Sequence, residues 1–85
     1  MTTWRLSLQD NYDGPGPVSA TITVTDTGEV TATGDGLELA KIIVFVPGTT
    51  RPLGPADGEP WLLGLADELG KNGTIIPTLE TMRSA

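Results

Sequence analysis

Residues 18–34 read VSATITVTDTGEVTATG, and this stretch decides the fold. Apolar and hydroxyl side chains alternate through residues 18–25 and again through residues 29–34, which is the period of a strand with one buried face. The DTG sequence at residues 26–28 suits a tight turn, because Asp can bond its own downstream backbone and Gly accepts left-handed dihedral angles. The stretch therefore predicts an antiparallel hairpin with one apolar face and one threonine-lined face.

A third alternating segment precedes this hairpin. In residues 3–9 (TWRLSLQ) the side chains of Trp4, Leu6 and Leu8 fall on one side of a strand. Residues 10–17 (DNYDGPGP) follow, and their prolines and glycines are typical of a surface loop. We therefore predict a strand over residues 3–9 that joins the hairpin through this loop.

Residues 37–46 (LELAKIIVFV) fit either a helix or a strand. The first half consists of good helix formers, whereas residues 42–46 form a β-branched and aromatic block that suits a strand buried on both faces. A helix over the whole stretch would be apolar nearly all round and would need complete enclosure. We therefore predict a strand over residues 40–46, and then a long proline-rich connection over residues 47–56 that carries Arg51.

Residues 58–69 show the helical period. We predict Asp57 as the N-cap, Glu59 in a first turn that favours negative charge, and Gly70 as the stop signal. Five apolar side chains cover a sector of about 140° on a helical wheel, the width expected of a helix that lies on a sheet. They are Trp61, Leu62, Leu65, Ala66 and Leu69. Leu63 falls outside this sector.

The end of the chain predicts one more short strand and a tail. Residues 74–78 (TIIPT) have the composition of a strand, and Pro77 places that strand at a sheet edge or a bulge because proline cannot donate a backbone hydrogen bond. We expect residues 79–85 to fray, with residues 80–85 forming a flexible tail.

Together these elements predict an α+β fold in one small domain over residues 1–85. The architecture is an antiparallel four- to five-stranded sheet, in the order β-β-β-β-α-β along the chain, with one amphipathic helix packed on one face. The expected core consists of Trp4, Leu6, Leu8, Ile22, Val24, Val30, Ile43, Phe45, Trp61, Leu62, Leu65 and Leu69. A domain this short removes proportionally less surface from water, so we expect a marginal stability to which association would add.

The composition argues against most common enzyme chemistries. The 85 residues contain no Cys and no His, so they offer no thiolate nucleophile, imidazole base or zinc-finger ligand set. Eleven acidic residues against five basic ones give a net charge of -6. Nucleic-acid binding draws its affinity from clustered Lys and Arg, so this balance argues against it. We therefore expect no catalysis, no cofactor and no nucleic-acid partner.

The sequence shows neither a secretory signal pattern nor an apolar run long enough for a membrane span. The longest uninterrupted apolar run is residues 42–46, far short of the length a span needs. We expect a cytoplasmic protein without a membrane partner. The scarcity of Lys and the abundance of Thr, Gly, Ala, Pro and Asp are typical of a GC-rich bacterial or phage genome.

The carboxylates raise one catalytic or metal-binding alternative. Asp10 and Asp13 lie in a Gly-containing loop of the kind that can supply oxygen ligands to Ca²⁺. However, Tyr12 stands where a second ligand is expected, and Thr21 stands at the position of the closing Glu. A small metal-dependent binder or hydrolase built on these loop carboxylates remains an alternative. Turn geometry explains Asp10 and Asp13 better.

The remaining functional class is a protein that binds other proteins. One helix leaves sheet edges and some apolar side chains uncovered, and Trp and Arg are frequent hot-spot residues. The candidate interaction surface comprises Arg51, Trp61, Leu63 and Tyr12. Core packing explains Trp61 equally well, and Leu63 would then be an isolated surface residue.

Our functional hypothesis is a small acidic, non-catalytic protein-interaction module that contacts a protein partner or forms a homodimer. An alternative is an acidic inhibitor, a DNA mimic or immunity-type protein that binds a basic partner through electrostatic attraction. The carboxylates are spread over loops and helix ends rather than in a row at the spacing of duplex phosphates, which favours the first hypothesis.

Overall fold

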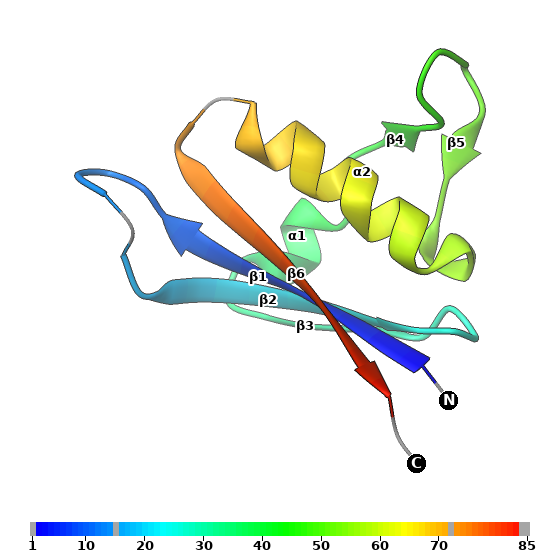
Figure 1. Ribbon diagram of the computed structural model, residues 1–85, viewed down its shortest axis with the longest axis horizontal. Helices are drawn as coiled ribbons and strands as arrows, with labels where there is room; N and C mark the ends of the chain where they lie inside the picture. Colours follow the sequence, from blue (N-terminus) through cyan, green and yellow to red (C-terminus); the bar gives the residue numbers. More distant parts are fainter. Residues whose placement is uncertain (1, 15, 72, 84–85) are drawn as a thin grey trace.

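Four strands form one antiparallel sheet in the order β3-β2-β1-β6 (Figure 1). The computed structural model describes residues 2–14, 16–71 and 73–83. The strands of the sheet are β1 (Thr2–Asp10), β2 (Val18–Thr25), β3 (Val30–Thr33) and β6 (Ile75–Arg83). The α+β class and the antiparallel sheet that the sequence predicts are therefore confirmed.

The hairpin of β2 and β3 follows the alternation of its sequence. Ile22 and Val24 are fully buried on one face. On the opposite face the hydroxyl oxygens of Thr21 and Thr33 lie 2.8 Å apart and share a hydrogen bond. Gly28 lies in the turn with a φ of 90°, a conformation that glycine adopts without the steric cost of a Cβ.

β6 is longer than predicted. Its last five residues pair with the first half of β1, Leu6 lies opposite Leu79, and the Arg5 guanidinium meets the Glu80 carboxylate at 2.7 Å. Leu79 also packs against the core. The prediction of a frayed tail from Leu79 is therefore wrong as far as Arg83, and the two residues after it lie outside the described residues.

Pro77 lies in an edge strand, as predicted. The backbone N–H of Asn11 donates to the Thr74 carbonyl at 3.1 Å. Because hydrogen-bonded and non-bonded pairs alternate along an antiparallel ladder, the nitrogen of Pro77 then faces away from β1. The missing N–H therefore removes no hydrogen bond from the β1–β6 ladder.

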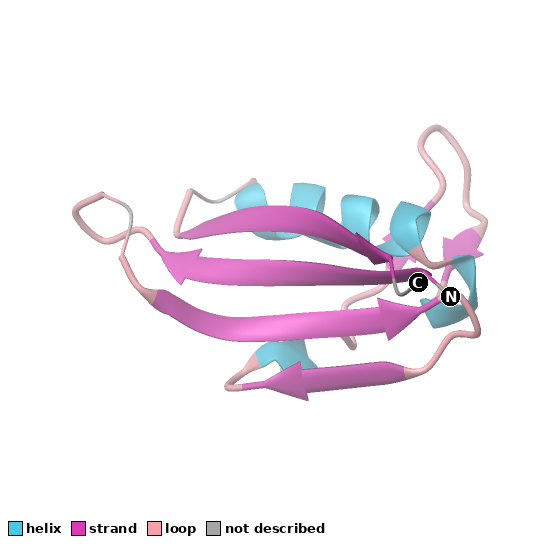
Figure 2. Ribbon diagram, turned by 60° about the horizontal axis from the view of Figure 1, so that its bottom comes forward, coloured by secondary structure: helices cyan, strands magenta, loops and turns pink. Residues whose placement is uncertain are grey.

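The main helix, α2 (Glu59–Gly70), covers one face of the sheet (Figure 2). Its buried residues are Trp61, Leu62, Leu65 and Leu69, as the helical period predicts. The N-cap is Gly58, so the prediction of Asp57 as the cap is wrong. Asp57 instead ends a 3₁₀ turn, η1 (Pro55–Asp57), where its carboxylate accepts the Gly54 backbone N–H at 2.8 Å.

The prediction of a strand over residues 40–46 is wrong for most of its length. A short helix, α1 (Gly36–Leu39), leads through a turn to the two-residue strand β4 (Val44–Phe45). β4 pairs with β5 (Pro52–Leu53) in a separate two-stranded sheet, so it adds no strand to the main sheet.

Two residues of this segment were also wrongly predicted in the core. Val44 is 3% exposed, whereas Ile43 is 69% exposed and Phe45 is 49% exposed. Successive side chains of a strand point to opposite sides, so Val44 packs against α2 at Gly64 and its two neighbours do not enter the core. Ile43 and Phe45, which we predicted in the core, therefore lie at the surface.

The core lies between α2 and the sheet, with Val44 at its side. Its buried residues are Leu6, Leu8, Ala20, Ile22, Val24, Val44, Trp61, Leu62, Leu65 and Leu69. Trp4 and Val30, both predicted in the core, are half-buried and pack against it. The opposite face of the sheet has no covering element in the part of the chain that the structure describes (Figure 2).

Candidate functional site

A groove of about 590 Å³ lies between α2 and the β4–β5 hairpin (residues 44–53), and we call it the α2–hairpin groove. The larger apolar side chains of its lining are Val44, Phe45, Val46, Pro47 and Leu53 from the hairpin, and Pro60 and Leu63 from the helix. Its volume lies within the range of sites that enclose small ligands or bulky side chains.

The hairpin can approach α2 closely because Gly64 has no side chain. A Cβ built at Gly64 would overlap the Cγ1 atom of Val44 and stand 3.8 Å from Leu53 Cδ1. A glycine inside a helix costs about 1 kcal/mol relative to alanine. The packing of the buried Val44 side chain against the bare backbone offsets this cost and forms the floor of the groove.

Two large apolar side chains face solvent from opposite walls of the groove. Phe45, from the hairpin, is 49% exposed, and Leu63, from the helix, is 51% exposed. Aromatic and aliphatic side chains that border a concave apolar surface are a common feature of docking sites. Leu63 was predicted to be a surface residue, whereas Phe45 was assigned to the core.

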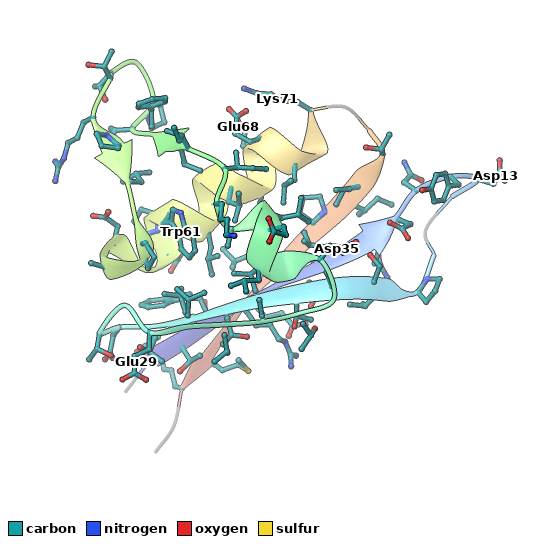
Figure 3. The ribbon with its side chains drawn as sticks, turned by 180° about the vertical axis from the view of Figure 1, so that it is seen from behind. Asp13, Glu29, Asp35, Trp61, Glu68 and Lys71 are labelled. Carbon is teal, nitrogen blue, oxygen red and sulfur yellow. The ribbon has the colours of Figure 1, made fainter. Side chains whose placement is uncertain are left out.

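The C-terminal end of α2 contributes charged residues to the groove. The Lys71 ammonium donates to Glu68 Oε1 at 2.8 Å and lies 4.0 Å from Asp67 Oδ2. Figure 3 shows Glu68 and Lys71 next to each other at this end of the helix. The pKa of Lys71 is raised from its ordinary value of 10.5, mainly by the hydrogen bond to Glu68 and then by the attraction of its charge. Two carboxylates and one ammonium leave this end of the groove with a net negative charge.

Arg51, another predicted surface residue, lies in the hairpin loop next to the groove but does not line it. Its backbone carbonyl accepts the Val46 N–H at 2.9 Å, and its N–H donates to the Thr49 hydroxyl at 3.2 Å. The exposed guanidinium forms no ion pair within the described residues. Arg51 lies between Thr49 and Leu53, which line the groove together with Leu63, so its guanidinium is attached next to this groove.

The other two predicted surface residues lie elsewhere. Trp61 is only 3% exposed and belongs to the core, so it offers almost no area to a partner. Tyr12 is 86% exposed, but it lies in the β1–β2 loop, at the opposite end of the molecule from the hairpin (Figures 1 and 2). Neither residue contributes to the α2–hairpin groove.

The loop carboxylates do not converge on a metal site. Among residues 2–14, 16–71 and 73–83, no three His, Cys, Asp or Glu side chains lie together as a metal-binding group would require. Asp10 instead shapes its loop, since its carboxylate accepts the Ser19 hydroxyl at 3.4 Å and its carbonyl accepts the Gly16 N–H at 3.0 Å. These contacts support the turn-geometry explanation of Asp10.

In the part of the chain that the structure describes, the carboxylates lie on many different elements. Figure 3 shows Asp13 and Glu29 at opposite ends of the sheet, and four other carboxylates are engaged in ion pairs with Arg5, Lys41 and Lys71. In the described part of the chain, the carboxylates are therefore spread over several elements, as the sequence indicates.

In the described part of the chain, no helix combines the length and the apolar character needed to cross a membrane. Comparison with known proteins finds no matching family model, no matching curated protein and no matching solved structure.

Proposed function

We propose that this protein is a small, non-catalytic protein-interaction module and that the α2–hairpin groove is its contact surface. One observation carries the proposal: Phe45 and Leu63 stand half-exposed on opposite walls of one apolar groove. Covering the exposed half of each side chain would contribute about 1 kcal/mol. Binding energy in protein interfaces is concentrated in such central apolar contacts, which a polar rim surrounds.

The occupant in this proposal is a segment of another protein that inserts an apolar side chain. The groove is formed by a helix and a hairpin that pack together through Gly64 and Val44, so it exists without the partner. A preformed groove reduces the ordering cost of association. A second copy of this chain is less favourable, because its net charge of -6 repels a chain of the same charge.

A peptide-display experiment tests the proposal. A phage library of random peptides is selected on the immobilised wild-type protein and counter-selected on Leu63→Glu, which places a charge on one wall of the groove. The control is Leu37→Glu, because Leu37 is 57% exposed on α1 and does not line the groove. Circular dichroism verifies that both variants are folded.

We expect enriched peptides to bind wild type and Leu37→Glu alike and to bind Leu63→Glu at least about tenfold more weakly, the effect of losing one central apolar contact. Peptides that bind all three proteins equally would refute the groove as the contact surface. Sedimentation equilibrium tests whether a second copy of this chain occupies the groove instead. A dimer that Leu63→Glu dissociates would show that it does.

A further inference from the structure

We infer that the α2–hairpin groove selects a basic segment, in which an apolar anchor side chain lies in the groove and a neighbouring Lys or Arg pairs with Asp67 and Glu68. This inference rests on the proposed function and specifies the chemistry of its partner. It excludes an acidic partner and a second copy of this chain.

Three charged residues stand at one end of the groove. Asp67, Glu68 and Lys71 all line it, and their side chains are 76%, 43% and 58% exposed. A carboxylate accepts several hydrogen bonds at once, so each carboxylate keeps free acceptor positions after its contact with Lys71. A cationic side chain of a partner can therefore share these carboxylates with Lys71 or displace it.

The net charge of the whole molecule has the same sign as this end of the groove. Eleven acidic and five basic residues give a net charge of -6, on a molecule whose shortest extent is 18 Å. Charges are screened over about 8 Å at physiological salt, so the nearby carboxylates dominate the attraction at contact, while the net charge accelerates the approach of a basic partner. Both effects have the same sign, which makes a basic segment the complementary one.

Lys71 provides a test in which the sign of the effect is decisive. Lys71→Gln removes the internal competitor for Asp67 and Glu68, so a basic peptide should bind more tightly to the variant. A peptide that used Lys71 to hold an acidic group would bind more weakly. Glu68→Gln should have the opposite effect and weaken the binding of a basic peptide.

The chain supplies matched controls for both substitutions. Lys41 and Glu38 form the same kind of exposed pair three positions apart, at 3.2 Å, and neither lines the groove. Lys41→Gln and Glu38→Gln therefore change the net charge of the protein by the same amounts as Lys71→Gln and Glu68→Gln. A difference between the two sets measures local pairing in the groove rather than long-range attraction.

The probes are synthetic peptides taken from the Leu63-dependent phage selection, each made once with its own sequence and once with Gln in place of every Lys and Arg. We expect the basic form to bind more tightly and to weaken as salt rises from about 50 to about 500 mM. Lys71→Gln should strengthen its binding by about threefold and Glu68→Gln should weaken it by about threefold, as expected for one exposed ion pair. The two control variants should stay near the wild-type affinity.

The outcomes separate this inference from the proposed function. If peptides depend on Leu63 but their Gln forms bind equally well, the groove remains the contact surface and the basic partner is refuted. If the selection enriches acidic peptides that Lys71→Gln weakens, the partner has the opposite charge. If no enriched peptide depends on Leu63, the proposed function fails, and this inference fails with it.

Discussion

The indole N–H of Trp4 donates to a carboxylate oxygen of Glu59 at 2.9 Å, which joins β1 to the first turn of α2 across 55 positions of sequence. Gly58, at the N-cap of α2, has a φ of 66° and lies directly against the Trp4 ring. A Cβ at Gly58 would stand 2.9 Å from Trp4 Cζ3, so a side chain there would displace the ring. Trp4 therefore fixes where α2 begins on the sheet.

Trp4→Phe should destabilise the protein by about 1 kcal/mol beyond its loss of ring area, because it removes the donor of a partly buried, charge-assisted hydrogen bond. Glu59→Gln should cost less, since a side-chain amide oxygen can still accept the indole N–H. Urea denaturation measures both effects. The cycle that removes the bond from both sides pairs Trp4→Phe with Glu59→Ala, and strictly additive effects in it would show that the bond contributes nothing.

Gly64→Ala should destabilise the protein by about 1–3 kcal/mol although alanine is the better helix former, because its methyl group would overlap Val44. The matched control is Gly70→Ala in the same helix, where a Cβ would meet only Pro77 atoms at 3.8 Å. That variant should be neutral or slightly more stable. Equal effects of the two substitutions on the denaturation midpoint would contradict the close approach of the hairpin.

Amide hydrogen exchange should alternate along β6. The register directs the N–H groups of Thr78, Glu80 and Met82 toward β1, so we expect them to exchange slowly. The N–H groups of Leu79 and Thr81 face the open edge and should exchange quickly. Uniformly rapid exchange over these five residues would support the frayed tail that the sequence predicted.

The ion pair of Lys71 predicts a small loss of stability at high pH. The folded protein raises the pKa of Lys71 above 10.5, so the stabilising effect of the pair is fully present below that value and is lost as pH rises through the higher pKa. Between pH 8 and pH 12, roughly the span of this titration, the stability difference between wild type and Lys71→Gln should shrink. In the Glu68→Gln variant, the pKa of Lys71 should return toward its ordinary value. An unchanged pKa would exclude Glu68 as the cause of the shift.

Elements with a regular local period could be predicted from the sequence, because burial on one face of a strand or helix imposes that period. This holds for the alternation of residues 18–34 and for the buried sector of α2. The strand of residues 40–46 could not be predicted correctly, since a two-residue strand has no period. The burial of Val44 depends on Gly64, which lies twenty positions further along the chain.

Part of the candidate site could also be predicted from the sequence. Leu63 and Arg51 were predicted at the surface because the first falls outside the apolar sector and the second lies in a proline-rich connection. Phe45 was missed because hydrophobicity alone does not show which side of a short hairpin faces the helix. Gly64, an isolated glycine inside a helical pattern, was the signal that another segment packs there.

The position of Pro77 has a consequence for misassembly. Exposed borders of sheets recruit further chains into fibres when they offer an uninterrupted row of donors and acceptors. In β6 that row is broken at Pro77, whose ring nitrogen faces outward and has no hydrogen to give. Among the described residues, the exposed edge that β6 forms therefore lacks one hydrogen-bond donor, and this gap opposes the addition of another strand. The β1–β6 ladder loses nothing by it, because that ladder does not use the N–H at this position.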